Sequence, residues 1–208
     1  MRKKIIAIIM LTAFSVVTLT SCTKNGTTDG NRVNNKQNIE SLFQTVCSAD
    51  EALELAKKSD AVVFEDNSCT SGNEVWESFF QSVSSKSPAS VLCAHYYTLD
   101  KEHVSEELYE KEKDLYPQLF FCLLEYDGKE YSLKSRESSV KEPDYQEKFK
   151  YLLHFTGDVP DTSPYFTSFD DYVLVDDSSL TLEDILVSMT SSQLDKIYKH
   201  FTIYSDYH

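Results

Sequence analysis

Hydrophobic residues recur along the chain with two different periods, which separate expected helices from expected strands. The apolar residues Ile39, Leu42, Phe43 and Val46 are spaced as on one face of a helix. Ser48 followed by Glu51 is typical of a capping box, which starts a second helix. The pattern predicts further helices at 72–84, 181–189 and 191–201, and a charged surface helix within 101–116.

Strand signals occupy much of the remaining sequence. Short apolar, β-branched or aromatic segments predict strands at 61–64, 90–99, 119–126, 131–133, 149–155 and 172–175. Leu119 to Tyr126 is apolar on both faces apart from Glu125, which is typical of a central strand. Asp127–Gly128 then predicts a hairpin with a two-residue turn, because such a turn needs positive φ.

The order of these segments indicates the fold class. Helices come first, then a series of strands joined as hairpins, and then helices again. This order favours an α+β fold: a mainly antiparallel sheet of five to six strands with helices packed on one face. A single domain over residues 39–208 is expected.

The N-terminal residues follow neither pattern and are typical of an export signal. Arg2, Lys3 and Lys4 precede the apolar run from Ile5 to Val17. At thirteen residues that run is shorter than the roughly 20 residues a membrane-spanning helix needs. Residues 1–21 are therefore expected to be a cleaved signal peptide rather than part of the fold.

Leu19, Thr20, Ser21 and Cys22 follow that run and closely resemble the lipobox of bacterial lipoproteins. The resemblance covers the first tenth of the chain. It implies cleavage between Ser21 and Cys22, with lipidation of Cys22 by diacylglycerol and further acylation, such as palmitate. An ordinary cleaved signal followed by a free Cys22 is the alternative. Residues 22–38 contain one valine among Asn, Thr and Gly, and are expected to be the lipidated cysteine and a flexible tether.

The charge balance limits the partners that the chain can have. The 20 basic and 34 acidic residues give a formal charge of −14. Loss of Arg2, Lys3 and Lys4 with the signal leaves 17 basic and 34 acidic residues, which is −17. Such a balance argues against nucleic acid as a partner, and anionic lipid would repel the domain. Acyl chains on Cys22 are therefore expected to hold the protein to the bacterial cell membrane, facing outside the cytoplasm.

A second, weaker resemblance concerns the folded part. The strings FKYLLHFTGDVP and YVLVDDSSLTLEDI are similar to parts of small secreted proteins of anaerobic bacteria that have no assigned activity. This resemblance covers about 60 residues. It implies neither a catalytic residue nor a substrate.

Four cysteines remain after Cys22, an even number that allows two disulfides in an exported protein. Of the three pairings, Cys47–Cys69 with Cys93–Cys122 is favoured. In the alternative, the thiols are reduced and buried as small apolar side chains.

Sequence motifs identify no catalytic, cofactor or metal site. The chain has no G-x-S-x-G, CxxC, HExxH or Gly-rich phosphate loop. Cys93 and His95 share a strand face, but two ligands fall short of a zinc site. The acidic pairs lack the spacing of a calcium loop.

Tyrosines supply the remaining candidate for a site. Tyr96, Tyr97, Tyr131 and His154 fall in expected strands and form a candidate binding face for a glycan or a protein. The alternative is that these rings cover the core. The expected function is thus a membrane-anchored binding domain of the cell envelope with an unknown protein or glycan partner. Two rival hypotheses are an envelope hydrolase with an acidic active site, and a structural lipoprotein supporting a larger complex.

Overall fold

The computed structural model describes residues 37–208 apart from residue 67 and residues 160–165. The expected signal peptide, the lipobox with Cys22 and the tether as far as residue 36 lie outside the described residues. The description starts with helical residues 37–44, which carry the apolar stripe predicted from Ile39 onward.

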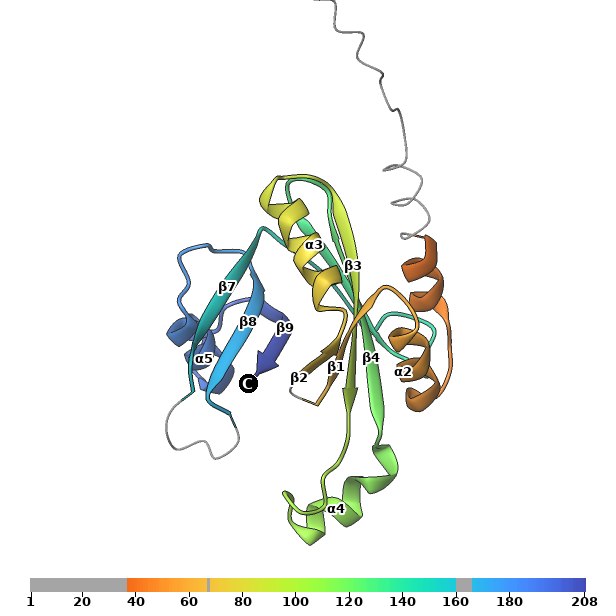
Figure 1. Ribbon diagram of the computed structural model, residues 1–208. Helices are drawn as coiled ribbons and strands as arrows, with labels where there is room; N and C mark the ends of the chain where they lie inside the picture. Colours follow the sequence, from red (N-terminus) through yellow and green to blue (C-terminus); the bar gives the residue numbers. More distant parts are fainter. Residues whose placement is uncertain (1–36, 67, 160–165) are drawn as a thin grey trace, which may run out of the picture.

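The larger of two sheets has six strands in the order β2-β1-β3-β4-β5-β6. Its strands are β1 (Ala61–Glu65), β2 (Ser68–Ser71), β3 (Ala89–Tyr97), β4 (Gln118–Tyr126), β5 (Tyr131–Glu137) and β6 (Tyr145–Phe149). The helical elements between or before them are α2 (Ala49–Lys57), α3 (Asn73–Ser84), α4 (Glu106–Glu112) and the short 3-10 helix η1 (Lys113–Leu115). In Figure 1, α4 projects beyond one end of this sheet, between β3 and β4.

The smaller sheet has three antiparallel strands in the order β7-β8-β9. Its elements are β7 (Tyr151–Asp158), β8 (Ser168–Val175), α5 (Leu182–Thr190), the 3-10 helix η2 (Leu194–Lys196) and β9 (His200–Tyr207). The strand expected at 149–155 is therefore two strands in two sheets, because the chain bends at Lys150 between β6 and β7.

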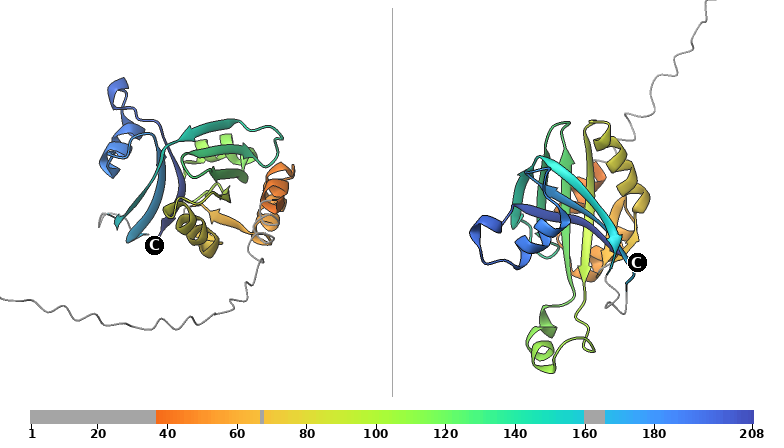
Figure 2. Two further views of the ribbon diagram at one scale, coloured as in Figure 1. Left: turned by 90° about the horizontal axis from the view of Figure 1, so that it is seen from above. Right: turned by 90° about the vertical axis from the view of Figure 1, so that its left-hand side faces the viewer.

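Three clusters of buried side chains hold together the layers that Figure 2 shows from two sides. The largest lies between the two sheets and includes Trp76 and Phe79 of α3. A second packs residues 37–44 and α2 against the opposite face of the six-stranded sheet. A third packs α5 on the outer face of the three-stranded sheet, through Val173, Val175 and Ile185.

The α+β class is confirmed, but the expected arrangement of the sheet is wrong. β1 and β3 are parallel, so the six-stranded sheet is mixed rather than antiparallel throughout. The reason is the connection between β2 and β3. The helix α3 crosses over there, so the chain enters β3 running in the same direction as β1. Gly72 starts that helix with a φ of 85°, where a Cβ would lie 2.3 Å from the carbonyl oxygen of Ala61.

Helices on one face of a single sheet were also expected, and this too is wrong. Residues 37–44 and α2 cover one face of the six-stranded sheet, while α3 packs on the other (Figures 1 and 2). The physical reason is that β1, β3 and β4 are apolar on both faces, so each face must be covered.

The helix expected at 191–201 is likewise absent. Residues 194–196 form only a 3-10 turn, and His200–Tyr207 is the strand β9. Pairing of β9 with β8 overrides the helical spacing of Leu194, Ile197 and Phe201, since the ladder satisfies the backbone groups of the whole segment.

The hairpin predicted at Asp127–Gly128 joins β4 to β5, but its connection has four residues instead of two. Tyr126 pairs with Tyr131. The carboxylate of Asp127 accepts hydrogen bonds from the amides of Lys129 and Glu130, and Gly128 has a φ of 101°. The aspartate therefore closes a longer turn than the sequence pair suggests.

Candidate functional site

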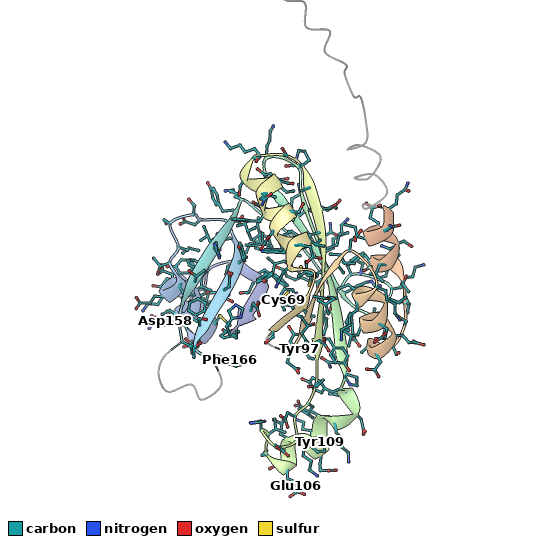
Figure 3. The ribbon with its side chains drawn as sticks, in the orientation of Figure 1. Cys69, Tyr97, Glu106, Tyr109, Asp158 and Phe166 are labelled. Atoms are coloured by element: carbon teal, nitrogen blue, oxygen red, sulfur yellow. The ribbon has the colours of Figure 1, made fainter. Side chains whose placement is uncertain are left out.

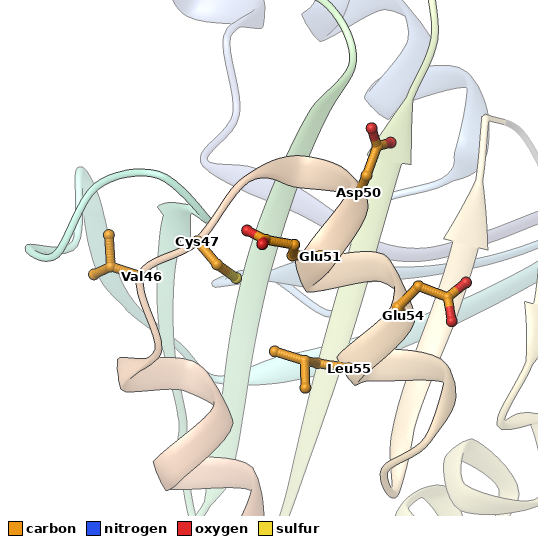
Figure 4. A pocket seen from close by; sticks show the side chains of 6 residues that line it. All are labelled: Val46, Cys47, Asp50, Glu51, Glu54 and Leu55. Carbon is orange, nitrogen blue, oxygen red and sulfur yellow. The ribbon is translucent and has the colours of Figure 1, made fainter.

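A wide-open hollow of about 660 Å³ lies beside α2. Figure 4 shows the six side chains that line it: Val46, Cys47, Asp50, Glu51, Glu54 and Leu55. Two of them are apolar side chains exposed to solvent, with 50% of Val46 and 42% of Leu55 accessible. Three are carboxylates. This set is called the α2 hollow below.

The local sequence explains why these side chains share one surface. Ser48 is the N-cap of α2, and its hydroxyl and Glu51 form the predicted capping box. Asp50 and Glu51 thus stand in the first turn, where negative charge is favourable beside the helix N-terminus. Glu54 and Leu55 follow one turn later, so both come next to the first-turn acids.

Each carboxylate of the hollow also has a partner within the protein. Asp50 accepts a hydrogen bond of 2.7 Å from the Tyr96 hydroxyl, and Glu54 pairs with Lys58 at 3.0 Å. Glu51 accepts from the Ser48 hydroxyl at 2.9 Å and from the Ser48 amide at 3.1 Å. These two bonds lower the pKa of Glu51. The Glu51 carboxylate therefore keeps its negative charge at neutral pH, and every carboxylate of the hollow retains lone pairs for a ligand.

The thiol of Cys47 lies between these carboxylates and a buried arginine. Burial and the nearby Glu51 raise the pKa of Cys47, and Arg136 only partly opposes them. The thiol is therefore protonated at neutral pH, and a protonated thiol is a poor nucleophile. This arrangement favours contact with a ligand over covalent catalysis.

Arg136 supports the hollow from inside and was not singled out from the sequence. Its guanidinium is fully buried and donates to the carbonyl oxygens of Phe43, Thr45, Glu137, Ser138 and Val140. It also lies over the rings of Phe43 and Phe121. Two of its acceptors, at Phe43 and Thr45, lie at the end of the helical residues 37–44, and the other three lie at the end of β5 and just after it. The arginine therefore fixes the chain on which Val46 and Cys47 stand. No motif could have signalled this, since all of its partners are backbone atoms and two of them lie 91 and 93 residues away.

The residues of the expected tyrosine face are dispersed in the structure. Tyr96 and Tyr97 are neighbours on β3, so they point to opposite faces of the sheet. Tyr131 is buried between the sheets beside Tyr126. His154 lies on the smaller sheet and stacks on Tyr172, with ring centroids 4.1 Å apart. The structure does not bring these four side chains together.

The structure has no disulfide among the four described cysteines. Cys93 and Cys122 lie directly opposite each other on β3 and β4, and the Cys122 thiol contacts the Ser135 hydroxyl at 3.5 Å. Cys47 packs against the cluster under α2, whereas Cys69 packs against the cluster on the other face of the sheet. A Cys47–Cys69 bond would need one of them to leave its cluster, while a Cys93–Cys122 bond stays a prediction.

A second polar group of side chains lies on the inner face of the smaller sheet. His154 contacts Asp170 at 2.6 Å, and Asp206 lies opposite Asp170 on β9. The Asp206 carboxylate is buried and accepts from the Cys69 amide at 2.9 Å. His154 has the rings of Phe80 and Tyr172 beside it. These contacts join the two sheets, and Figure 3 shows Cys69 at this junction.

Within the described residues, no group of three or more His, Cys, Asp or Glu side chains is arranged to hold a metal ion. In that same part of the chain, none of the helices has the length and apolar composition needed to cross a membrane. Comparisons with protein-family models, with curated proteins and with solved structures found no match.

Proposed function

We propose that this chain is a lipid-anchored binding domain on the outer side of the bacterial cell membrane. In this proposal Cys22 carries the acyl chains, and the α2 hollow binds a cationic, amphipathic segment of another envelope protein. The observation that carries the binding site is the exposure of Val46 and Leu55 among three carboxylates. Apolar side chains with accessible surface gain free energy when a partner covers them.

The chemistry of the lining favours a protein segment over a glycan. Sugar-binding sites stack their ligands on aromatic rings, and none of the six lining residues is aromatic. A segment with lysine or arginine beside leucine-like residues would meet both parts of the hollow. Because the hollow is open and its carboxylates are hydrated, we expect weak binding, with a Kd on the order of 10–100 µM.

Titration calorimetry on the lipoprotein purified in nonionic detergent tests this site. The probe is a synthetic amphipathic helix of leucine and lysine, with empty micelles as the blank and a leucine–glutamate peptide for comparison. Glu54→Lys reverses one charge on the rim, where 63% of this side chain is exposed. We expect about tenfold weaker binding, equal to about 1.4 kcal/mol.

Glu102→Lys is the matched control, because it makes the same charge change at an exposed position in the connection between β3 and α4, which does not line the hollow. It should leave the affinity for the leucine–lysine peptide almost unchanged. Equal weakening by both variants would mean that only the net charge of the protein attracts the peptide. Equal binding of the glutamate peptide would also contradict the proposal.

A further inference from the structure

The outer edge of β7 has no strand partner among the described residues. β7 has eight residues and pairs with β8 along one side only. Tyr151, His154, Thr156 and Asp158 are exposed. The strand has no proline, lysine or arginine, which are the residues that usually prevent an edge from pairing with another chain.

The other edge strands of the described part are protected. β2 has four residues and lies beside β9, the other edge strand of the smaller sheet, so these two edges cover each other. There the Cys69 amide donates to the Asp206 carboxylate at 2.9 Å. β6 exposes Gln146, Glu147 and Lys148. Its Lys148 carbonyl accepts from the ammonium of Lys199 at 2.5 Å, and Glu147 pairs with the same ammonium at 3.0 Å. β7 is therefore the edge left open.

The register shows which backbone groups of β7 are available. The Val159 amide donates to the Thr167 carbonyl at 2.8 Å, in the same register as the β7–β8 ladder. Hydrogen-bonded pairs alternate along an antiparallel ladder, so the backbone amides and carbonyls of Gly157, Phe155 and Leu153 also point toward β8. The amides and carbonyls of the even-numbered residues, Leu152, His154, Thr156 and Asp158, consequently point outward.

We propose that two copies of the chain pair antiparallel through this edge, about a two-fold axis at Phe155. Outward groups must meet outward groups, so His154 pairs with Thr156 of the second copy, and Leu152 with its Asp158. The two Phe155 side chains then lie side by side. A two-fold axis at His154 would also pair outward-pointing backbone groups along the whole edge. It would, however, set two imidazoles opposite each other, which is unfavourable when both are protonated.

The side chains of β7 suit a second copy of themselves. No two carboxylates become opposite each other, because Asp158 is the only acidic residue of the strand. Leu153 and Phe155 pack on the outer face with Ile185 of α5, and α5 and the segment after it also carry exposed apolar residues. These are Leu186, Met189, Leu194 and Ile197. A second copy adds buried apolar area there, which favours a dimer over pairing with a polar peptide.

Cysteine cross-linking of the full chain in bacterial cells tests the axis. Phe155→Cys places two thiols in directly opposed positions, so diamide should convert most of the protein into a disulfide-linked dimer. Leu153→Cys is the matched control on the same face. Its position lies opposite Gly157 of the second copy, so, like the wild type, it should form no disulfide-linked dimer. Cross-linking of Leu153→Cys instead of Phe155→Cys would overturn this register.

Native mass spectrometry of the detergent-solubilised protein tests the edge itself. The wild type should have twice the mass of one chain. Thr156→Pro removes an outward amide and leaves the β7–β8 ladder intact, so it should give a monomer with an unchanged circular-dichroism spectrum. Gln146→Lys, on the protected edge of β6, should remain a dimer. A monomeric wild type, or a dimer that survives Thr156→Pro, would overturn the proposal.

Discussion

His95 shows how much the surroundings of one residue can change its chemistry. Its ring stacks on Phe64 with centroids 4.6 Å apart, and its Nε2 is buried without a hydrogen-bond partner among the described residues. Burial lowers the pKa of His95 from 6.5 to about 4. An imidazole that titrates so low is neutral at the pH of most bacterial habitats, so it acts as a packing group rather than as a general acid.

The His95 pKa predicts how stability depends on pH. The unfolded chain binds a proton at His95 near pH 6.5, and the folded chain does so only near pH 4. The free energy of unfolding therefore decreases as the pH falls from 6.5 to 4, by about 3 kcal/mol in total. Above pH 6.5 the imidazole is neutral in both states, and this stability is fully present. Urea unfolding at pH 7 and pH 4.5 should show a larger loss of stability for the wild type than for His95→Phe.

The carboxylates titrate in the same interval, but they do so equally in both proteins and cancel in the difference. His208→Phe serves as the control, because its imidazole is 58% exposed. It should follow the wild type at both pH values. An identical pH dependence of the wild type and His95→Phe would contradict the assignment of a low pKa to His95.

At the scale of elements, residues 37–44 are held to the sheet by one buried side chain as well as by apolar contacts. Arg136 donates to five carbonyl oxygens and has no carboxylate among these partners. Burial lowers the pKa of Arg136, yet a guanidinium remains charged at any physiological pH. The arginine thus acts as a clamp between the segment before α2 and the segment after β5.

Removal of this clamp should be strongly destabilising. Arg136→Met leaves buried carbonyl oxygens without donors, and we expect a loss of about 3–5 kcal/mol in the free energy of unfolding. Arg136→Lys should recover only part of it, because an ammonium cannot reach all these acceptors. Chemical denaturation measures the loss, and hydrogen exchange should show it concentrated at residues 39–47.

Lys134→Met is the matched control for Arg136→Met, since it removes a cation two residues earlier on the same strand. Lys134 is partly exposed and pairs with Glu125 at 3.8 Å, so the change should cost less than about 1 kcal/mol. A similar cost for both variants would indicate that Arg136 contributes only its charge.

For the whole molecule, the layered fold places the two proposed interaction surfaces on different sides of the six-stranded sheet. The helices of residues 37–57 carry the α2 hollow and stand where the chain enters the fold (Figure 1). The smaller sheet lies on the other side of the six-stranded sheet and presents the open edge of β7. An anchored copy could therefore bind a partner at one side and a second copy at the other without competition between them.

The proposed anchor is testable on the whole protein. Metabolic labelling of bacterial cells with a palmitate analogue should label the wild type, because the lipobox resemblance implies acylation at Cys22. Cys22→Ala should lose the label, and Cys47→Ala should keep it. An unlabelled wild type, or equal labelling of Cys22→Ala, would exclude the lipid anchor.

Local signals in the sequence were sufficient for several elements. The capping pair Ser48–Glu51 starts α2, and the apolar stripe around Trp76 and Phe79 forms α3. The doubly apolar run Leu119–Tyr126 lies within β4, between β3 and β5 in the sheet. These features depend on hydrogen bonds and side-chain spacing within a few residues, which is why the amino-acid order alone determines them.

Other features depend on partners far along the chain, and only the tertiary structure decided them. β9 is a strand because β8 offers it a ladder, and β1 is parallel to β3 because α3 crosses between them. The α2 hollow exists because Val46 and Leu55, apolar residues expected to follow the helical pattern, are left uncovered where two helices meet the sheet. The sequence alone determined which residues are apolar and where elements start; long-range packing decided which of those apolar residues remain available to a partner.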